Sequence, residues 1–195
     1  MIQLASKLVL TANRCGTSRS NKNRFKAPLN TSHDCTTDSP CSDATVLRRT
    51  AMDYLARREH SALELQRKLL HRFPDASSAL ISEVLVQLRR DHLQSDERFA
   101  ECWVRYRQSR GFGYLHILTD LKERGIASEV VDRYLYLDDD NWTAMAKSLI
   151  SKRLAADEKI EFGSKTHRRL MRFLQSRGFG GREIQRAVEP YLSQC

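Results

Sequence analysis

One stretch of the chain, Gly111–Ile126, has the pattern of a complete α-helix with both ends marked. Its apolar residues recur at spacings of three and four, which places them on one face of a helix: Tyr114, Ile117, Leu118 and Leu121. Gly125 stands just past the predicted end, where a left-handed residue is needed and glycine enters without strain. Ile126 would then fold back onto Leu121, which is the apolar contact of a Schellman ending.

The same ending recurs later in the chain. Arg177, Gly178 and Phe179 follow an apolar run that closes at Leu174, so Phe179 would fold onto Leu174 in the same register. Two helices with one type of ending predict an internal repeat. The hexapeptide QSRGFG also occurs twice, at 108–113 and 175–180, but at different places within the predicted unit. We interpret that identity as a coincidence of loop sequence and align the repeats by their helix endings.

Helical periodicity is nearly continuous from residue 45, and no strand pattern competes with it. Ser61 and Glu64 predict a capping box, in which each side chain bonds the other residue's backbone amide. Ser95 and Ser128 are further predicted N-caps. The predicted fold class is all-α, with three tandem three-helix repeats at 45–93, 94–139 and 140–195. A helix pair cannot bury its apolar faces alone, so the units are expected to stack, share a core and form an elongated, curved body.

Residues 1–44 have a different composition, rich in Ser, Thr, Asn and Arg, and are predicted to be a disordered tail. The excess of basic residues before Asp34 faintly resembles a transit peptide, and an upstream start codon chosen in error would give a similar tail. The five cysteines are odd in number and form no CxxC, which favours reduced thiols and a cytoplasmic location. His33, Cys35 and Cys41 lack the spacing of a standard zinc site, so no metal site is predicted.

The net charge of +9 predicts anionic partners, and no apolar run is long enough to span a membrane. A search for catalytic patterns finds no phosphate-binding GKS/T loop and no HExxH. The acidic run 138–140 is interpreted as a solvated helix cap rather than a metal site. Trp103 and Trp142 are interpreted as core residues, because each lies within a helical apolar stripe. We therefore predict that the chain is not an enzyme and needs no cofactor.

Three motifs resemble those of one known family, the RecX regulatory proteins. The run Ala51–Leu69, AMDYLARREHSALELQRKL, is similar to the family's opening motif. The family's central motif is similar to Asp96, Phe99 and Ala100 followed by 107–126. Its closing motif is similar to Arg169-Leu170-x-x-Phe173-Leu174 with Arg177-Gly178-Phe179. The resemblance covers residues 45–190 in order and leaves the tail outside it. In the first unit, Pro74-Asp75 replaces the Arg-Gly ending.

The resemblance implies a monomeric bacterial modulator of RecA that binds in the groove of the RecA–DNA filament. Such proteins block filament extension or promote disassembly, and so suppress ATPase, strand-exchange and coprotease activities in recombination, DNA repair and the SOS response. The alternative from the residues themselves is a sequence-neutral nucleic-acid-binding repeat, which would contact single- or double-stranded DNA directly.

The helix predicted at 164–177 supplies the candidate contact surface. It contains no acidic residue, and its cations fall opposite the apolar side formed by Leu170, Phe173 and Leu174. Like charges four residues apart repel by a few tenths of a kcal/mol, which an anionic partner would turn into attraction. The predicted partner-binding residues are Lys165, Arg168, Arg169, Arg172 and Arg177, and we expect the surface to continue through Arg107, Arg110, Lys122 and Arg124. The simpler interpretation is a solvated basic face.

Overall fold

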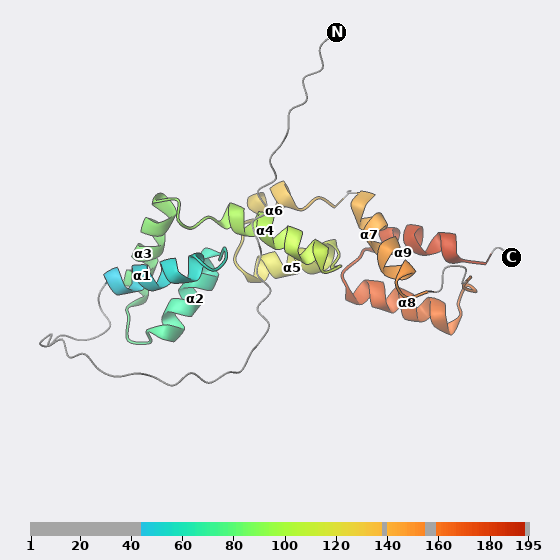
Figure 1. Ribbon diagram of the computed structural model, residues 1–195, viewed down its shortest axis with the longest axis horizontal. Coiled ribbons are helices and arrows are strands. Elements are labelled where there is room, and N and C mark those ends of the chain that lie inside the picture. The colour runs from blue at the N-terminus through green and yellow to red at the C-terminus, as the bar shows by residue number, and fades with distance from the viewer. Residues whose placement is uncertain (1–43, 138–139, 155–158, 194–195) are drawn as a thin grey trace, which may run out of the picture. The chain divides into compact units, whose positions relative to one another are not determined.

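The computed structural model describes residues 44–137, 140–154 and 159–193. These residues form helices and connections, and the only β pairing among them is an isolated bridge between Ile160 and Leu192. The chain is all-α with helical repeats, as predicted (Figure 1). A 3₁₀ turn at Glu189–Tyr191 follows the last helix. In chain order the helices are α1 (Ala44–Leu55), α2 (Ala62–Arg72), α3 (Ser78–Arg90), α4 (Asp96–Ser109), α5 (Tyr114–Glu123), α6 (Ser128–Tyr134), α7 (Asp140–Ser151), α8 (Lys165–Ser176) and α9 (Gly181–Val188).

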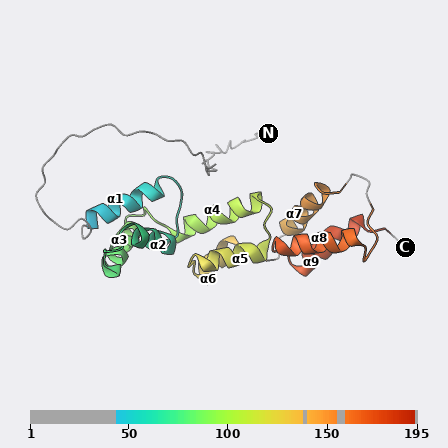
Figure 2. The ribbon, with the colours of Figure 1, turned by 90° about the horizontal axis from the view of Figure 1, so that it is seen from below.

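The helices pack in consecutive groups of three, which Figure 2 shows as α1–α3, α4–α6 and α7–α9. The first group has a core of its own, formed by the stripes of α1, α2 and α3 around Leu47, Leu65 and Leu88. The second and third groups share one core, which runs from Phe99 in α4 to Val188 in α9. The expectation of a shared core is therefore wrong for the first group. Its apolar stripes face one another, and apart from Leu63, which lies against Gly125, its connection to α4 and α5 is polar.

That connection is made by side chains near the start of α2. The Ser61 hydroxyl donates to the Arg124 carbonyl at 2.9 Å, and the Ala62 amide donates to Asp96 Oδ1 at 2.9 Å. Arg98 Nε donates to Glu59 Oε1, also at 2.9 Å. Charged and hydroxyl groups therefore join the first group of helices to the second, without an apolar core between them.

The predicted helix endings are confirmed. Gly125 and Gly178 have φ of +72° and +85°, and the amide following each glycine donates to the carbonyl of Leu121 or Leu174. α4 ends in the same way at Gly111, with φ of +74°. α3 does so as well, but with His92 in the left-handed position at φ of +57°. A histidine there carries the strain that glycine avoids, so this ending was not predictable from a glycine in the sequence.

The two QSRGFG segments have the same conformation, although they lie at different places within their groups, as predicted: one follows α4, the first helix of the second group, and the other follows α8, the second helix of the third. Each ends a helix with a left-handed glycine and begins the next with an extended one, Gly113 before α5 and Gly180 before α9. The segments also pack against each other. The Gly113 amide donates to the Arg177 carbonyl at 2.8 Å, and the Leu115 amide donates to the Gly178 carbonyl at 2.9 Å. A Cβ on Gly113 would lie 2.5 Å from the Gly178 oxygen, so the close approach requires glycine.

Several predicted caps differ in detail. Ser61 caps α2 through the Glu64 amide at 3.1 Å, but the Glu64 carboxylate bonds His60 Nδ1 at 2.9 Å, so only half of the capping box forms. Ser95 caps α4 as predicted. Ser128 does not cap α6: it is the first helical residue, and Ala127 precedes it without a side-chain cap. Ala44 already belongs to α1, whereas residues 1–43 of the predicted tail lie outside the described residues.

Candidate partner-binding surface

The helix α8 carries a row of four exposed cations, which we call the basic stripe: Lys165, Arg168, Arg169 and Arg172. Ser164 starts the helix by accepting the His167 amide at 3.1 Å, and Leu170 and Leu174 bury its opposite side. Because that apolar side is fixed in the core, the stripe is held toward solvent. Its one internal hydrogen bond among the described residues runs from Arg172 Nε to the Arg168 carbonyl at 3.4 Å. The stripe is therefore available to an anionic partner.

Four arginines and three aromatic rings alternate in space between α5 and the end of α7. Each guanidinium carbon lies 3.6 to 5.5 Å from the centroid of a neighbouring ring, within the range of cation–π attraction. We call this row the arginine–aromatic ladder. Its members, in order, are Arg124, Trp103, Arg107, Phe112, Arg177, Phe173 and Arg153. The ladder brings together three of the predicted site residues: Arg107, Arg124 and Arg177.

These three arginines are held by partners within the fold. Arg107 Nε lies 2.6 Å from Asp120 Oδ2 as an ion pair without hydrogen-bond alignment, and Arg124 Nε lies 3.4 Å from Glu64 Oε1. Arg177 donates to the carbonyl of Arg110 at 3.0 Å, across the contact between the QSRGFG segments. All three are partly buried. They position α4, α5 and α8 against one another, and less of each guanidinium remains for a partner.

The carboxyl of Glu64 has a lowered pKa. Burial alone would raise the pKa of its carboxyl. The hydrogen bond from His60 and the charges of Arg58 and Arg124 outweigh burial and hold the pKa below its ordinary value. Glu64 is thus ionised where it meets Arg124, and the junction between the first two repeats contains a fixed negative charge.

The remaining predicted site residues, Arg110 and Lys122, are exposed. Arg110 follows α4 and touches the third repeat through its carbonyl, while Lys122 lies in the last turn of α5. Together with the basic stripe they leave six of the nine predicted cations accessible to a partner. That they form one continuous surface stays a prediction.

A groove of about 700 Å³ borders the basic stripe, between α8 and the residues that follow α7. Arg153, Arg169 and Arg172 line it, with the hydroxyls of Thr166 and Ser176. Leu154, Leu170 and Phe173 form its apolar lining. No carboxylate of a described residue lines it. Sequence reasoning missed Arg153, because the residue lies in a connection without helical periodicity. The signal that could have found it is the basic pair Lys152-Arg153 directly after a helix end.

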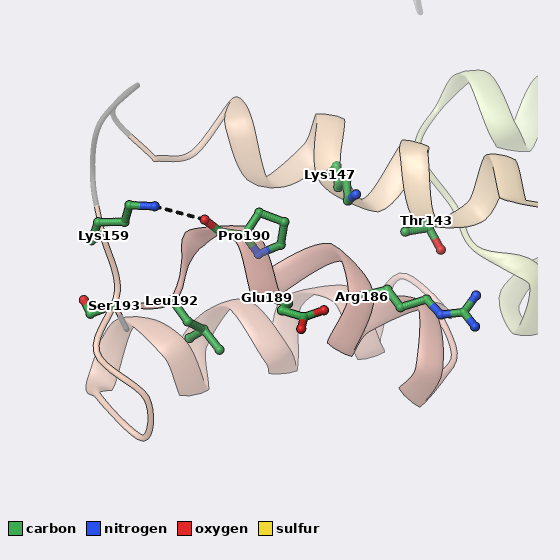
Figure 3. A pocket seen from close by; sticks show the side chains of 8 residues that line it. All are labelled: Thr143, Lys147, Lys159, Arg186, Glu189, Pro190, Leu192 and Ser193. Carbon is green, nitrogen blue, oxygen red and sulfur yellow. Dashed lines mark hydrogen bonds between the residues drawn. The ribbon is translucent and has the colours of Figure 1, made fainter. Parts of the chain in front are cut away.

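A second concavity, of about 1010 Å³, lies between α7 and the C-terminal 3₁₀ turn (Figure 3). Lys147 and Arg186 line it from α7 and α9, and the Glu189 carboxylate lines it as well. The Lys159 ammonium donates to the Pro190 carbonyl at 3.2 Å, as the dashed line in Figure 3 shows. Its charges are mixed, so the Arg153 groove is the stronger anion site.

The two tryptophans differ in burial, and part of the acidic run lies in a helix. Trp142 is a core residue, 1% exposed, and donates to the Tyr136 carbonyl at 2.7 Å. Trp103 is half-buried, with Phe99 stacked on it and two arginines over its ring. Asp140 lies in the first turn of α7, whereas 138–139 lie outside the described residues. His33, Cys35 and Cys41, for which no zinc site is predicted, also lie outside them. In the described part of the chain, no group of three His, Cys, Asp or Glu could hold a metal, and no helix there is long and apolar enough to cross a membrane.

Comparison with known proteins identifies the family. Models of two RecX domains match the chain, the second three-helix domain at residues 95–135 and the third at 139–188. Regulatory protein RecX of Pseudomonas putida is 38% identical over 133 residues, covering 68% of this chain and 83% of that protein. Regulatory protein RecX of Xanthomonas oryzae pv. oryzae is 37% identical over 140 residues, covering 71% and 84%.

A solved structure shows the same fold. The crystal structure of RecX from Lactobacillus salivarius matches 76% of this chain and 96% of its own, with a TM-score of 0.61 at 20% identity. The matched 76% of this chain is more than two helix groups contain, so the likeness extends across all three helix groups in the described part of the chain. With curated relatives above 35% identity over most of their length, the chain belongs to the RecX family of regulatory proteins.

Proposed function

We propose that this protein binds the RecA–DNA filament and restrains the activities of RecA, by blocking filament extension or promoting disassembly. It would act as a monomer in the bacterial cytoplasm and modulate recombination, repair and the SOS response. Membership of the RecX family supports the proposal. The structural observation that carries it is the basic stripe, whose four cations are exposed on a helix with no acidic residue.

The proposed mechanism needs binding alone. A filament grows by adding protomers at its end, so a protein seated across that end or in the groove excludes the next protomer by occupying its place. Such inhibition needs far fewer inhibitors than protomers, and it requires no chemistry from the bound protein. The basic stripe would supply electrostatic attraction, and the ladder would hold α8 in a fixed orientation relative to α4 and α5.

A DNA-dependent RecA ATPase assay tests the proposal. Added at a substoichiometric ratio, the wild-type protein is expected to lower ATP hydrolysis. Arg168→Glu with Arg172→Glu reverses the centre of the stripe and is expected to abolish inhibition while far-UV circular dichroism stays unchanged. The matched control, Arg49→Glu with Arg90→Glu, changes the net charge equally at two exposed arginines of the first repeat and should retain inhibition.

Three results would count against this proposal. Unchanged ATPase with the wild-type protein contradicts regulation of RecA. Full inhibition by the folded stripe variant removes the stripe as the contact and leaves it as a solvated face. Equal loss in the control variant would mean that total charge, rather than this surface, governs binding.

The second candidate function is sequence-neutral nucleic-acid binding, favoured by the net charge of +9. Salt dependence separates the two. Binding through phosphates alone weakens steeply as salt rises, because each neutralised phosphate releases counterions. A mixed interface with RecA protein loses less affinity over the same range.

A further inference from the structure

We propose that the groove beside α8 binds the phosphodiester backbone of single-stranded DNA, with Arg153 as its anchoring cation. This inference rests on the proposed function, because it names the DNA strand of the filament as the ligand of this surface. It adds a residue and a binding site that lie outside the helix from which the surface was predicted.

The Arg153 side chain differs from the other three arginines of the ladder in its partners. Of the four arginines in the ladder, Arg107 and Arg124 face carboxylates and Arg177 donates to a carbonyl. Arg153 lies 3.6 Å above the Phe173 ring, and no carboxylate of a described residue pairs with it. Stacking fixes the plane of a guanidinium while its N–H edges stay free, which suits the fork-like recognition of a phosphate. Arg153 is therefore the ladder member prepared for an external anion.

Further cations and hydroxyl donors lie beside Arg153 in the groove. Arg169 and Arg172 line the same groove, and Thr166 and Ser176 place hydroxyl donors at its edge. Lys165 and Arg169, like Arg168 and Arg172, follow one another along α8 at a rise of about 6 Å, from 1.5 Å per residue. A regular row of cations matches a ligand with regularly repeated charge. A nucleic-acid backbone has that property by its covalent structure, whereas an acidic protein surface has no such repeat.

The apolar part of the groove distinguishes a single strand from a duplex. Leu154, Leu170 and Phe173 form an apolar lining beneath the arginines. A duplex presents phosphates on its outside and keeps its bases stacked within, so it would leave this apolar lining without contacts. A single strand offers sugar and base faces as well as phosphates. The groove thus fits one strand better than two.

Fluorescence anisotropy with a labelled oligothymidine, in the absence of RecA, tests the inference. Arg153→Gln removes one cation, and Lys152→Gln is the matched control, an exposed neighbour outside the groove with the same charge change. One phosphate contact contributes a slope of about −0.7 in log K against log salt. Arg153→Gln is expected to reduce this slope by about 0.7. If the variant and the wild type bind equally at an extrapolated 1 M salt, the variant then binds about fivefold more weakly at roughly 0.1 M. Lys152→Gln should leave the slope unchanged.

The outcomes separate this inference from the proposed function. An unchanged slope in Arg153→Gln, or an equal change in Lys152→Gln, overturns the groove as a phosphate site. Tighter binding of a duplex of the same length, with the same loss in Arg153→Gln, overturns the single strand as ligand. Loss of RecA inhibition by Arg153→Gln without any loss of oligothymidine binding would mean that an acidic protein segment occupies the groove, and overturns the inference while the proposed function stands. Wild-type protein that binds DNA but leaves RecA ATPase unchanged would contradict the function alone. A melting curve of each variant shows that the change is not one of folding, since Arg153 also packs on Phe173.

Discussion

Gly178 is the position where a single added methyl group should be most costly. Its φ of +85° is one that other residues enter with strain, and an added Cβ would lie 2.4 Å from the His116 backbone nitrogen. Backbone atoms cannot turn aside as the end of a side chain can. Gly178→Ala should therefore push α8 away from α5. The two hydrogen bonds across that contact would then be lost, Leu115 to Gly178 at 2.9 Å and Gly113 to Arg177 at 2.8 Å.

Two other left-handed glycines supply the scale for this effect. Gly163 has φ of +75° with no atom within 4 Å of an added Cβ, so Gly163→Ala meets strain alone, about 1 kcal/mol. At Gly125 the added Cβ meets the Leu63 Cδ2 at 2.9 Å, a flexible side-chain end, and the cost should be about 1.5 kcal/mol. Gly178→Ala adds to the same strain an overpacking of about 1–3 kcal/mol and the loss of two hydrogen bonds of about 1 kcal/mol each, for a total of about 4–6 kcal/mol.

Thermal denaturation followed by circular dichroism measures this order. At about 3 °C per kcal/mol for a chain of this size, Gly163→Ala should lower Tm by about 3 °C and Gly178→Ala by about 10 °C or more. Equal shifts for the two variants would refute the reasoning, because they share the backbone strain and differ in the surrounding atoms. A Gly178→Ala protein as stable as the wild type would show that α8 does not pack on the start of α5.

Two further predictions follow from single residues. His92→Gly should stabilise the protein by about 0.5 kcal/mol, because relief of left-handed strain exceeds the extra freedom glycine gives the unfolded chain, and a Tm below the wild type would contradict it. Because the folded pKa of Glu64 is lowered, the unfolded chain binds the extra proton, and the stability due to Glu64 is present above its ordinary pKa of 4.5 and lost as pH falls through the folded pKa. The Tm of the wild type should therefore fall more steeply below pH 4.5 than that of Glu64→Gln, and parallel Tm curves would refute the role of the charge.

Local patterns predicted most of the fold. The spacing of apolar residues predicted a helical chain from residue 45, and the glycines located the Schellman endings of α5 and α8. What the sequence could not predict depends on tertiary contacts. The ending at His92 uses a residue that only its surroundings hold in a left-handed conformation. The separate core of the first repeat depends on which stripes face one another, and periodicity does not contain that information.

The candidate surface was predictable only in its regular part. The basic stripe follows from helical geometry, and the structure places all four of its cations on the exposed side. Arg107, Arg124 and Arg177 look like the stripe residues in the sequence, yet each meets an acceptor or an aromatic ring from a distant segment. Arg153 is the opposite case, a site residue that the sequence pattern does not mark. Its neighbours in the groove come from α8, and periodicity does not predict the path of the connection between α7 and α8. In both cases, contacts between residues far apart in the sequence decide which charges remain free.

The docking of one QSRGFG segment on the other limits how such a chain can be rebuilt. Gly113 and His116, on one side of this contact, lie in the second repeat. Gly178, whose backbone approaches them closely, lies in the third. A protein engineer who deletes the third repeat uncovers two amide groups that now have carbonyl partners, and also opens the core that both repeats share. The second and third repeats must therefore be moved as one block. The first repeat, with its own core and a junction of polar side chains, is the one module whose exchange leaves the other core intact.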